Sequence, residues 1–103
     1  MKFRVDLDVF GMAMFFFLGE KEKERYLKAT HYENKNVTSD CKGLNYNNAI
    51  WLSTLDLSVL IHEIHHAKHF LVTTIGIHDE ETEAYIMTYV FKEALRKIKR
   101  LDK

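Results

Sequence analysis

The chain has 103 residues, of which 47% are hydrophobic and 13% aromatic, and its 15 basic and 15 acidic side chains give a formal net charge of zero. This length suits one domain over residues 1–103, and the composition is that of a globular protein. A neutral chain has no overall field that would draw it to nucleic acid or to an anionic membrane, so we expect neither as a partner. The single cysteine, Cys41, excludes an internal disulfide and favours a reducing compartment such as the cytoplasm.

The N-terminal segment predicts a β-hairpin. Apolar and polar residues alternate from Phe3 to Phe10, which is typical of a half-buried strand. Gly11 interrupts the alternation, and Met12 to Leu18 then predicts a more fully buried strand, so we expect the chain to turn near Gly11. The apolar run is too short to span a bilayer, and acidic residues precede it where a signal peptide is basic.

The middle of the chain predicts a short helix, a loop and a strand. Glu20 to Ala29 is rich in Glu, Lys and Arg and predicts a solvated helix. Thr30 to Asn48 is dominated by Asn, Asp, Ser, Thr and Gly and predicts mostly loop. Ala49 to Ser53 is a short apolar strand, which we expect to pair with Leu44 to Tyr46 across a turn at Asn47-Asn48.

Two longer helices follow. Ser53 or Asp56 is suited to cap the first, which runs to about Thr73, and Gly76 breaks the chain before Asp79 caps the second. With strands early and helices late, the sequence predicts an α+β fold. We expect a small antiparallel sheet, made of the hairpin and the short strand near 49–53, packed on these helices.

The first of the two helices carries the strongest functional signal. His62 and His66 are four residues apart, so they stack one turn above the other, on the side opposite the apolar residues. Glu63 is next to His62 around the helix, near enough to contact a water on a shared cation. The apolar stripe that should face the core recurs at three- and four-residue steps: Leu57, Leu60, Ile61, Ile64, Ala67 and Leu71.

The His62-Glu63-x-x-His66 sequence provides what a catalytic zinc site needs in five residues. Such a site uses three protein ligands and keeps one position for water. An adjacent carboxylate can then act as the general base. The sequence therefore predicts one Zn²⁺ held by His62 and His66, with Glu63 as the base. The alternative is a histidine-rich solvated face that matches the pattern by accident, because His65 and His69 lie in the same helix.

The third ligand is expected from the start of the final helix. Placed on a helical wheel, Glu81 borders the apolar stripe, Glu80 lies within it and Glu83 points away, so spacing leaves Glu80 and Glu81 both open. The alternative for all three is an ordinary acidic first turn, favourable with the helix dipole. The expected stripe is made of five residues: Ala84, Met87, Phe91, Leu95 and Ile98.

These motifs resemble the zincin superfamily. The His-Glu-x-x-His helix followed by Glu80-Glu81-x-x-Ala84-Tyr85 is similar to the gluzincin type, and most similar to short zincin-like proteins encoded by phages and prophages. The resemblance covers residues 44–91 by motif. It implies that Glu81, three residues before Ala84, is the third zinc ligand. Gluzincins often have an aspartate that supports a metal-binding histidine where this chain has Tyr85.

The resemblance also implies a function. It predicts a minimal zincin-like metallopeptidase in the cytoplasm of a bacterial host or encoded by a phage, acting on a peptide or protein substrate. In such enzymes the strand before the active-site helix often pairs with extended substrate, and Ala49–Ser53 is the candidate here. The alternative for this segment is a plain edge strand of a small sheet.

Several functional alternatives stay open at the level of sequence. Tyr85, Tyr89, His78 or His69 is a candidate to stabilise an oxyanion. A fourth protein ligand, such as His69 or His78, would instead make a closed structural site. The chain would then be a catalytically inactive zinc-binding module for protein interaction, a phage accessory or regulatory protein. A metal-free interaction domain, a homodimer and an unidentified protein partner are further alternatives.

Overall fold

The computed structural model describes residues 1–30 and 42–101. It is a small α+β fold in which a mixed four-stranded sheet, in the order β1-β2-β4-β3, packs against three helices. Two short 3-10 segments, Asp8–Phe10 and Glu20–Glu22, complete the described elements. The strands and α-helices have these bounds: β1 Lys2–Leu7, β2 Met12–Leu18, α1 Lys23–Thr30, β3 Gly43–Tyr46, β4 Ala49–Leu52, α2 Leu57–Ile75 and α3 Glu80–Leu101.

The predicted N-terminal hairpin is confirmed. Strands β1 and β2 pair antiparallel, with Phe3 opposite Phe16 and Leu7 opposite Met12. The first strand ends at Leu7 and not at Phe10 as predicted, because Asp8–Phe10 coils into a 3-10 turn. Gly11 closes this turn at a φ of 64°, a left-handed conformation that glycine adopts without strain.

The predicted all-antiparallel arrangement of the sheet is wrong. The turn at Asn47-Asn48 forms as expected, with Asn47 at a φ of 56°, and β3 and β4 pair antiparallel. However, β4 also pairs parallel with β2 on its other side. Strand β4 is therefore central and fully buried, so it is neither an edge strand nor a free rim for substrate. The edge beside it belongs to β3.

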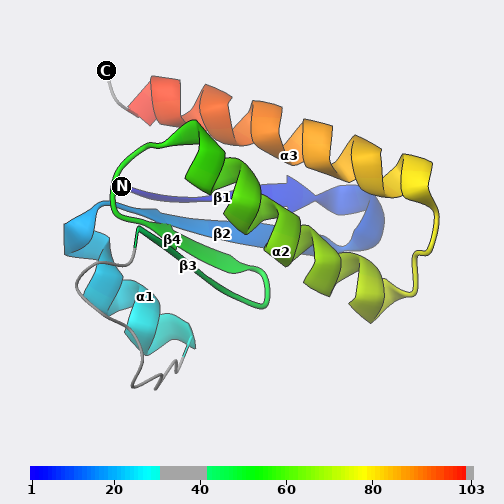
Figure 1. Cartoon of the computed structure of the whole chain (residues 1–103), viewed down its shortest axis with the longest axis horizontal. Coiled ribbons are helices and arrows are strands. Elements are labelled where there is room, and N and C mark those ends of the chain that lie inside the picture. The colour runs from blue at the N-terminus through cyan, green and yellow to red at the C-terminus, as the bar shows by residue number, and fades with distance from the viewer. Residues whose placement is uncertain (31–41, 102–103) are drawn as a thin grey trace.

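The two faces of the sheet are covered by different helices. Figure 1 shows α2 and α3 running antiparallel to each other and α1 lying apart from them. On one face, Phe16, Ile50 and Leu52 join the core that includes residues of α2 and α3. On the other face, Phe17 and Trp51 pack with Tyr26 of α1. This alternation explains why both faces of β4 are apolar.

Helix α2 begins and ends where the sequence predicts. The Asp56 side chain accepts hydrogen bonds from the backbone N–H of Ser58 and Val59, at 2.9 and 3.4 Å. Gly76 ends the helix at a φ of 76°. The predicted stripe is confirmed over Leu60, Ile64, Ala67 and Leu71, whereas Leu57 and Ile61 are about half exposed.

Helix α3 packs on the core with most of the predicted stripe and with three residues that were not predicted. Ile98 is buried and Met87, Phe91 and Leu95 pack against the core as expected, whereas Ala84 is exposed. The most fully buried residues of the helix are Ile86, Val90 and Ala94, which lie beside that stripe. Glu83, predicted to point away, is half-buried against α2, and Glu80, predicted within the stripe, is exposed.

Parts of the predicted loop, including Cys41, lie outside the described residues. Within the described residues, no helix combines the length and hydropathy that a membrane span requires.

Candidate metal centre

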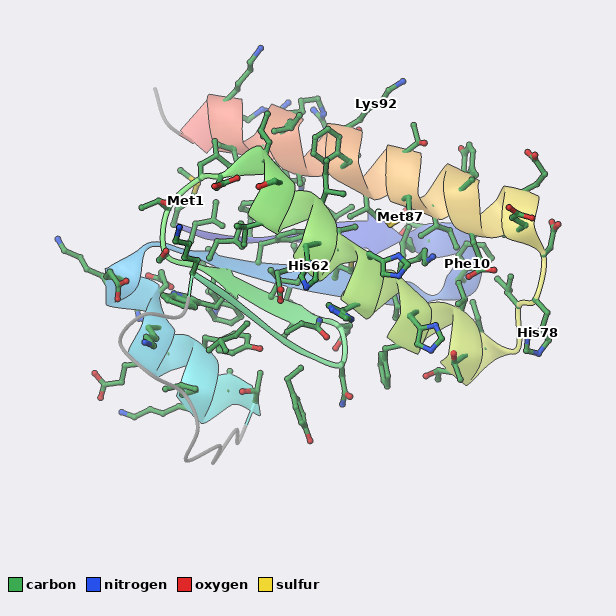
Figure 2. The ribbon with its side chains drawn as sticks, viewed as in Figure 1. Met1, Phe10, His62, His78, Met87 and Lys92 are labelled. Carbon is green, nitrogen blue, oxygen red and sulfur yellow. The ribbon has the colours of Figure 1, made fainter. Side chains whose placement is uncertain are left out.

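The two histidines of the motif meet on the outer face of α2. The Nε2 atoms of His62 and His66 are 3.2 Å apart, and the ring centroids are 4.7 Å apart with the rings nearly perpendicular. Both side chains are exposed. Figure 2 shows His62 on the N-terminal half of α2. The local helix geometry therefore places two nitrogen donors side by side without help from any other element.

The separation of these donors suits a zinc ion. Two nitrogens that each lie 2.0–2.1 Å from one tetrahedral zinc are about 3.3 Å apart. The Nε2 atoms of His62 and His66 match this spacing. Without metal, the same 3.2 Å separation fits an N–H···N hydrogen bond between two neutral imidazoles, whose donor depends on the tautomer. The pair thus fits zinc as two of its ligands, which would require both rings to carry their proton on Nδ1.

Glu63 lies at the base of this pair. Its Oε1 is 3.7 Å from His62 Nε2, and only 7% of the residue is exposed. Burial raises the pKa of the Glu63 carboxyl, and the neighbouring His62 and His66 partly oppose this by lowering it. A carboxylate held in a desolvated site next to the donors is suited to accept a proton.

Gly43 of β3 makes room for Glu63. A Cβ at position 43 would lie 2.8 Å from Val59 Cγ1 and 3.2 Å from Glu63 Cγ. Helix α2 therefore approaches the edge of the sheet so closely that only a glycine fits beneath it. Glu63 thus lies on the side of α2 that faces β3 and is buried, while His62 and His66 are exposed.

The substitution Gly43→Ala is expected to lower the free energy of unfolding by about 1–3 kcal/mol, the usual cost of overpacking. The methyl group must displace Val59 or Glu63. Urea denaturation measures the loss, with Lys42→Ala, a substitution at the exposed residue next to Gly43, as the control. Adding Val59→Ala should restore part of the stability, since it removes the closest contact. A Gly43→Ala variant as stable as wild type would contradict the close approach of α2.

The structure does not bring Glu81 to the histidines. Glu81 is exposed in the first turn of α3, where its backbone N–H is capped by Asp79 at 3.3 Å. The glutamate that contacts α2 is Glu83, whose Oε1 is 3.5 Å from Lys68 Nζ. Among the described residues, no group of three or more His, Cys, Asp or Glu side chains is arranged to hold a metal ion. Glu81 as third ligand stays a prediction.

The other predicted residues are scattered. His78 lies in the loop between α2 and α3, far from His62 in Figure 2. Tyr85 and Tyr89 line a pocket with the β1–β2 connection. Only His69 shares a groove with His66. This groove runs between α2 and the β3–β4 turn and is lined by Asn45, Asn47, His66, His69, Phe70, Thr73 and Thr74.

Sequence reasoning missed three residues that shape the site. Gly43 falls in a segment predicted as loop. Asn45 lies in the predicted Leu44–Tyr46 pairing segment but was given no role at the site, and the roles of both residues depend on the pairing of β3 with β4. Lys68 is 8% exposed and pairs with Glu83 across the two helices. A signal for Lys68 existed, because it stands four residues after Ile64 and thus within the buried arc of α2.

Comparison with known proteins gives no relative for this arrangement. No family model matches the chain, and no curated protein or solved structure matches it. The function must therefore be argued from the geometry of the site.

Proposed function

We propose that this chain is a zinc-dependent metallopeptidase-like protein that hydrolyses peptide bonds. The observation that carries the proposal is the 3.2 Å separation of His62 Nε2 and His66 Nε2, with the buried Glu63 carboxylate 3.7 Å from the first of them. A bound zinc ion supplies the Lewis acidity that makes water a nucleophile near neutral pH. His62 and His66 would hold the ion, and Glu63 would accept a proton from the attacking water and donate it to the leaving amine.

The edge of β3 supports a peptide as the substrate class. The Ser53 N–H donates to the Lys42 carbonyl at 3.0 Å. Because every second residue of an antiparallel strand bonds to the same neighbour, the backbone groups of Leu44 and Tyr46 also point toward β4. The backbone groups of Gly43 and Asn45 therefore point to the outer edge, where no described strand pairs with them. An extended peptide that adds to this edge would run beside the face of α2 that carries His66.

The complete ligand set is part of the proposal. The resemblance to gluzincins adds Glu81 to the two histidines, whereas the described geometry supports the histidines alone. The first turn of α3 would have to reach the histidine face of α2 for Glu81 to bind. Measuring zinc affinity in a Glu81→Ala variant decides between these ligand sets.

The test of hydrolysis is a quenched-fluorescence peptide library incubated with the zinc-loaded protein. We expect cleavage that a chelator abolishes and added zinc restores, and that the Glu63→Gln variant loses by at least about 100-fold, since it lacks the general base. Full zinc occupancy without cleavage of any peptide would contradict the peptidase proposal. The chain would then be a zinc-binding module for protein interaction. Cleavage unchanged in Glu63→Gln would assign the activity to a contaminant.

A stability measurement tests whether Glu63→Gln loses the general base while keeping the fold. The raised pKa of Glu63 means that folding favours the protonated carboxyl over the carboxylate, relative to the unfolded chain. The stability gained from protonation is fully present below the ordinary value of 4.5 and is lost as the pH rises through the raised value. At pH 7, metal-free Glu63→Gln should thus be at least as stable as wild type in urea, and this advantage should vanish below pH 4.5.

A further inference from the structure

A second pocket opens far from the histidines, between the β1–β2 connection and the N-terminal half of α3. Its volume is about 210 Å³, and its walls include Asp6, Asp8, Val9, Phe10, Tyr85 and Tyr89. Figure 2 shows Phe10 beside the N-terminal half of α3, well away from His62. Small-molecule pockets usually hold about 300–1,000 Å³, so this pocket is the size of one amino-acid side chain.

The pocket exposes apolar surface that the fold leaves uncovered. Tyr85 is 70% exposed and Val9 is 91% exposed. The rings of Tyr85 and Tyr89 are stacked, with centroids 6.4 Å apart and an angle of 12° between their planes. Tyr89 also donates a hydrogen bond from its hydroxyl to the Asp6 carbonyl at 3.4 Å, which ties α3 to the end of β1. Two nearly parallel aromatic rings and an exposed valine therefore form one exposed apolar patch.

The charge around this surface is negative. Asp6 is paired with Arg4, whose Nε is 3.2 Å from Asp6 Oδ1. Asp8 is exposed and has no ion pair within the described part of the chain. Glu81 stands four residues before Tyr85 and so lies one turn away on the same face of α3. Of the described residues, no basic side chain forms an ion pair with Asp8, which lines the pocket, or with Glu81, which lies one turn from Tyr85.

We propose that this pocket binds an arginine side chain presented by a partner polypeptide. Aromatic faces attract cations, and the planar guanidinium stacks on such faces better than an ammonium group does. The guanidinium would lie against Tyr85 with Asp8 as its charge partner, and the aliphatic stem of the arginine would cover Val9 and Phe10. This interaction goes beyond the proposed zinc chemistry and does not depend on it.

The test is a nuclear magnetic resonance titration of the ¹⁵N-labelled full chain, in chelator, with two capped pentapeptides. One has the sequence Ala-Ala-Arg-Ala-Ala, and the other has neutral citrulline in place of arginine. We expect the arginine peptide to shift the amides of Asp8, Val9 and Tyr85, and to bind at least about fivefold more tightly than the citrulline peptide. Tyr85→Ala should weaken its binding about tenfold, and Asp8→Asn should remove most of the preference for arginine.

Matched variants separate the pocket from general effects. Tyr85→Phe keeps the ring and should keep most of the binding, and Tyr46→Ala, which removes an exposed tyrosine on β3, should change nothing. Because Tyr85 is 70% exposed, its replacement should leave the protein folded, which the same spectra show. Equal binding of the two peptides would mean that the pocket recognises apolar contact alone, and absence of shifts at millimolar peptide would rule out the site. Either result overturns the proposal, whatever the zinc measurements give.

Discussion

Replacing either His62 or His66 by alanine is expected to lower the affinity of the protein for zinc by about 100-fold. Structural zinc sites with four ligands bind with about 10–16 kcal/mol, or roughly 3 kcal/mol for each ligand, which is about two orders of magnitude in the dissociation constant. The two Nε2 atoms already stand at the spacing of a shared ion, so each should contribute fully. Competition with a chromophoric chelator measures the affinities directly.

The neighbouring histidines provide the controls. His65 and His69 lie on the same exposed side of α2, but Nε2 of His66 is paired with His62. We expect His65→Ala and His69→Ala to change zinc affinity only slightly. If all four substitutions weaken binding equally, the helix is a diffuse histidine-rich face, and the specific centre at His62 and His66 does not exist.

The absolute affinity of the wild-type protein reports the number of ligands. Two ligands at roughly 3 kcal/mol each give about 6 kcal/mol, which corresponds to a dissociation constant of tens of micromolar. A nanomolar value requires at least one more protein donor. Glu81→Ala and Glu80→Ala form a matched pair for identifying it, because both residues are exposed in the first turn of α3. A loss of zinc affinity in Glu81→Ala but not in Glu80→Ala would establish the gluzincin-like ligand set.

Trp51→Ala is expected to lower the free energy of unfolding by about 3–5 kcal/mol, a large part of the 5–15 kcal/mol that holds a typical domain together. Trp51 is fully buried in the central strand β4, where it packs with Tyr26 and Phe17. Its Nε1–H donates to the Gly19 carbonyl at 2.8 Å, and Lys23 Nζ lies 4.9 Å from the ring centroid. The alanine variant loses these contacts and leaves a cavity.

Urea denaturation followed by circular dichroism measures this loss. Leu57→Ala serves as the control, because Leu57 is an apolar residue that is 50% exposed and its truncation should change stability by less than about 0.5 kcal/mol. Trp51→Phe should fall between the two, since it keeps an aromatic ring but loses the donor to Gly19. A loss for Trp51→Ala no larger than for Leu57→Ala would contradict the position of β4 at the centre of the sheet.

The sequence by itself determined the features that depend on near neighbours in the chain. The hairpin near Gly11, the turn at Asn47-Asn48 and the ends of α2 at Asp56 and Gly76 follow from local backbone preferences. The meeting of His62 and His66 has the same origin, because residues four apart on any α-helix lie side by side.

Only the tertiary structure decided how these elements meet. A short apolar run such as Ala49–Leu52 is compatible with an edge strand or a central strand of a sheet. Its parallel pairing with β2 joins residues 34 apart in the chain, such as Phe15 and Ala49, which no local pattern links. Spacing found most of the apolar face of α3, but the residues buried deepest, Ile86, Val90 and Ala94, lie to one side of the predicted stripe. Glu83 lies on the face of α3 that contacts α2, where it pairs with Lys68, whereas Glu81 is exposed one turn before Tyr85. The sequence thus supplied the donors on one helix, while long-range packing determined which side chains from other elements reach them.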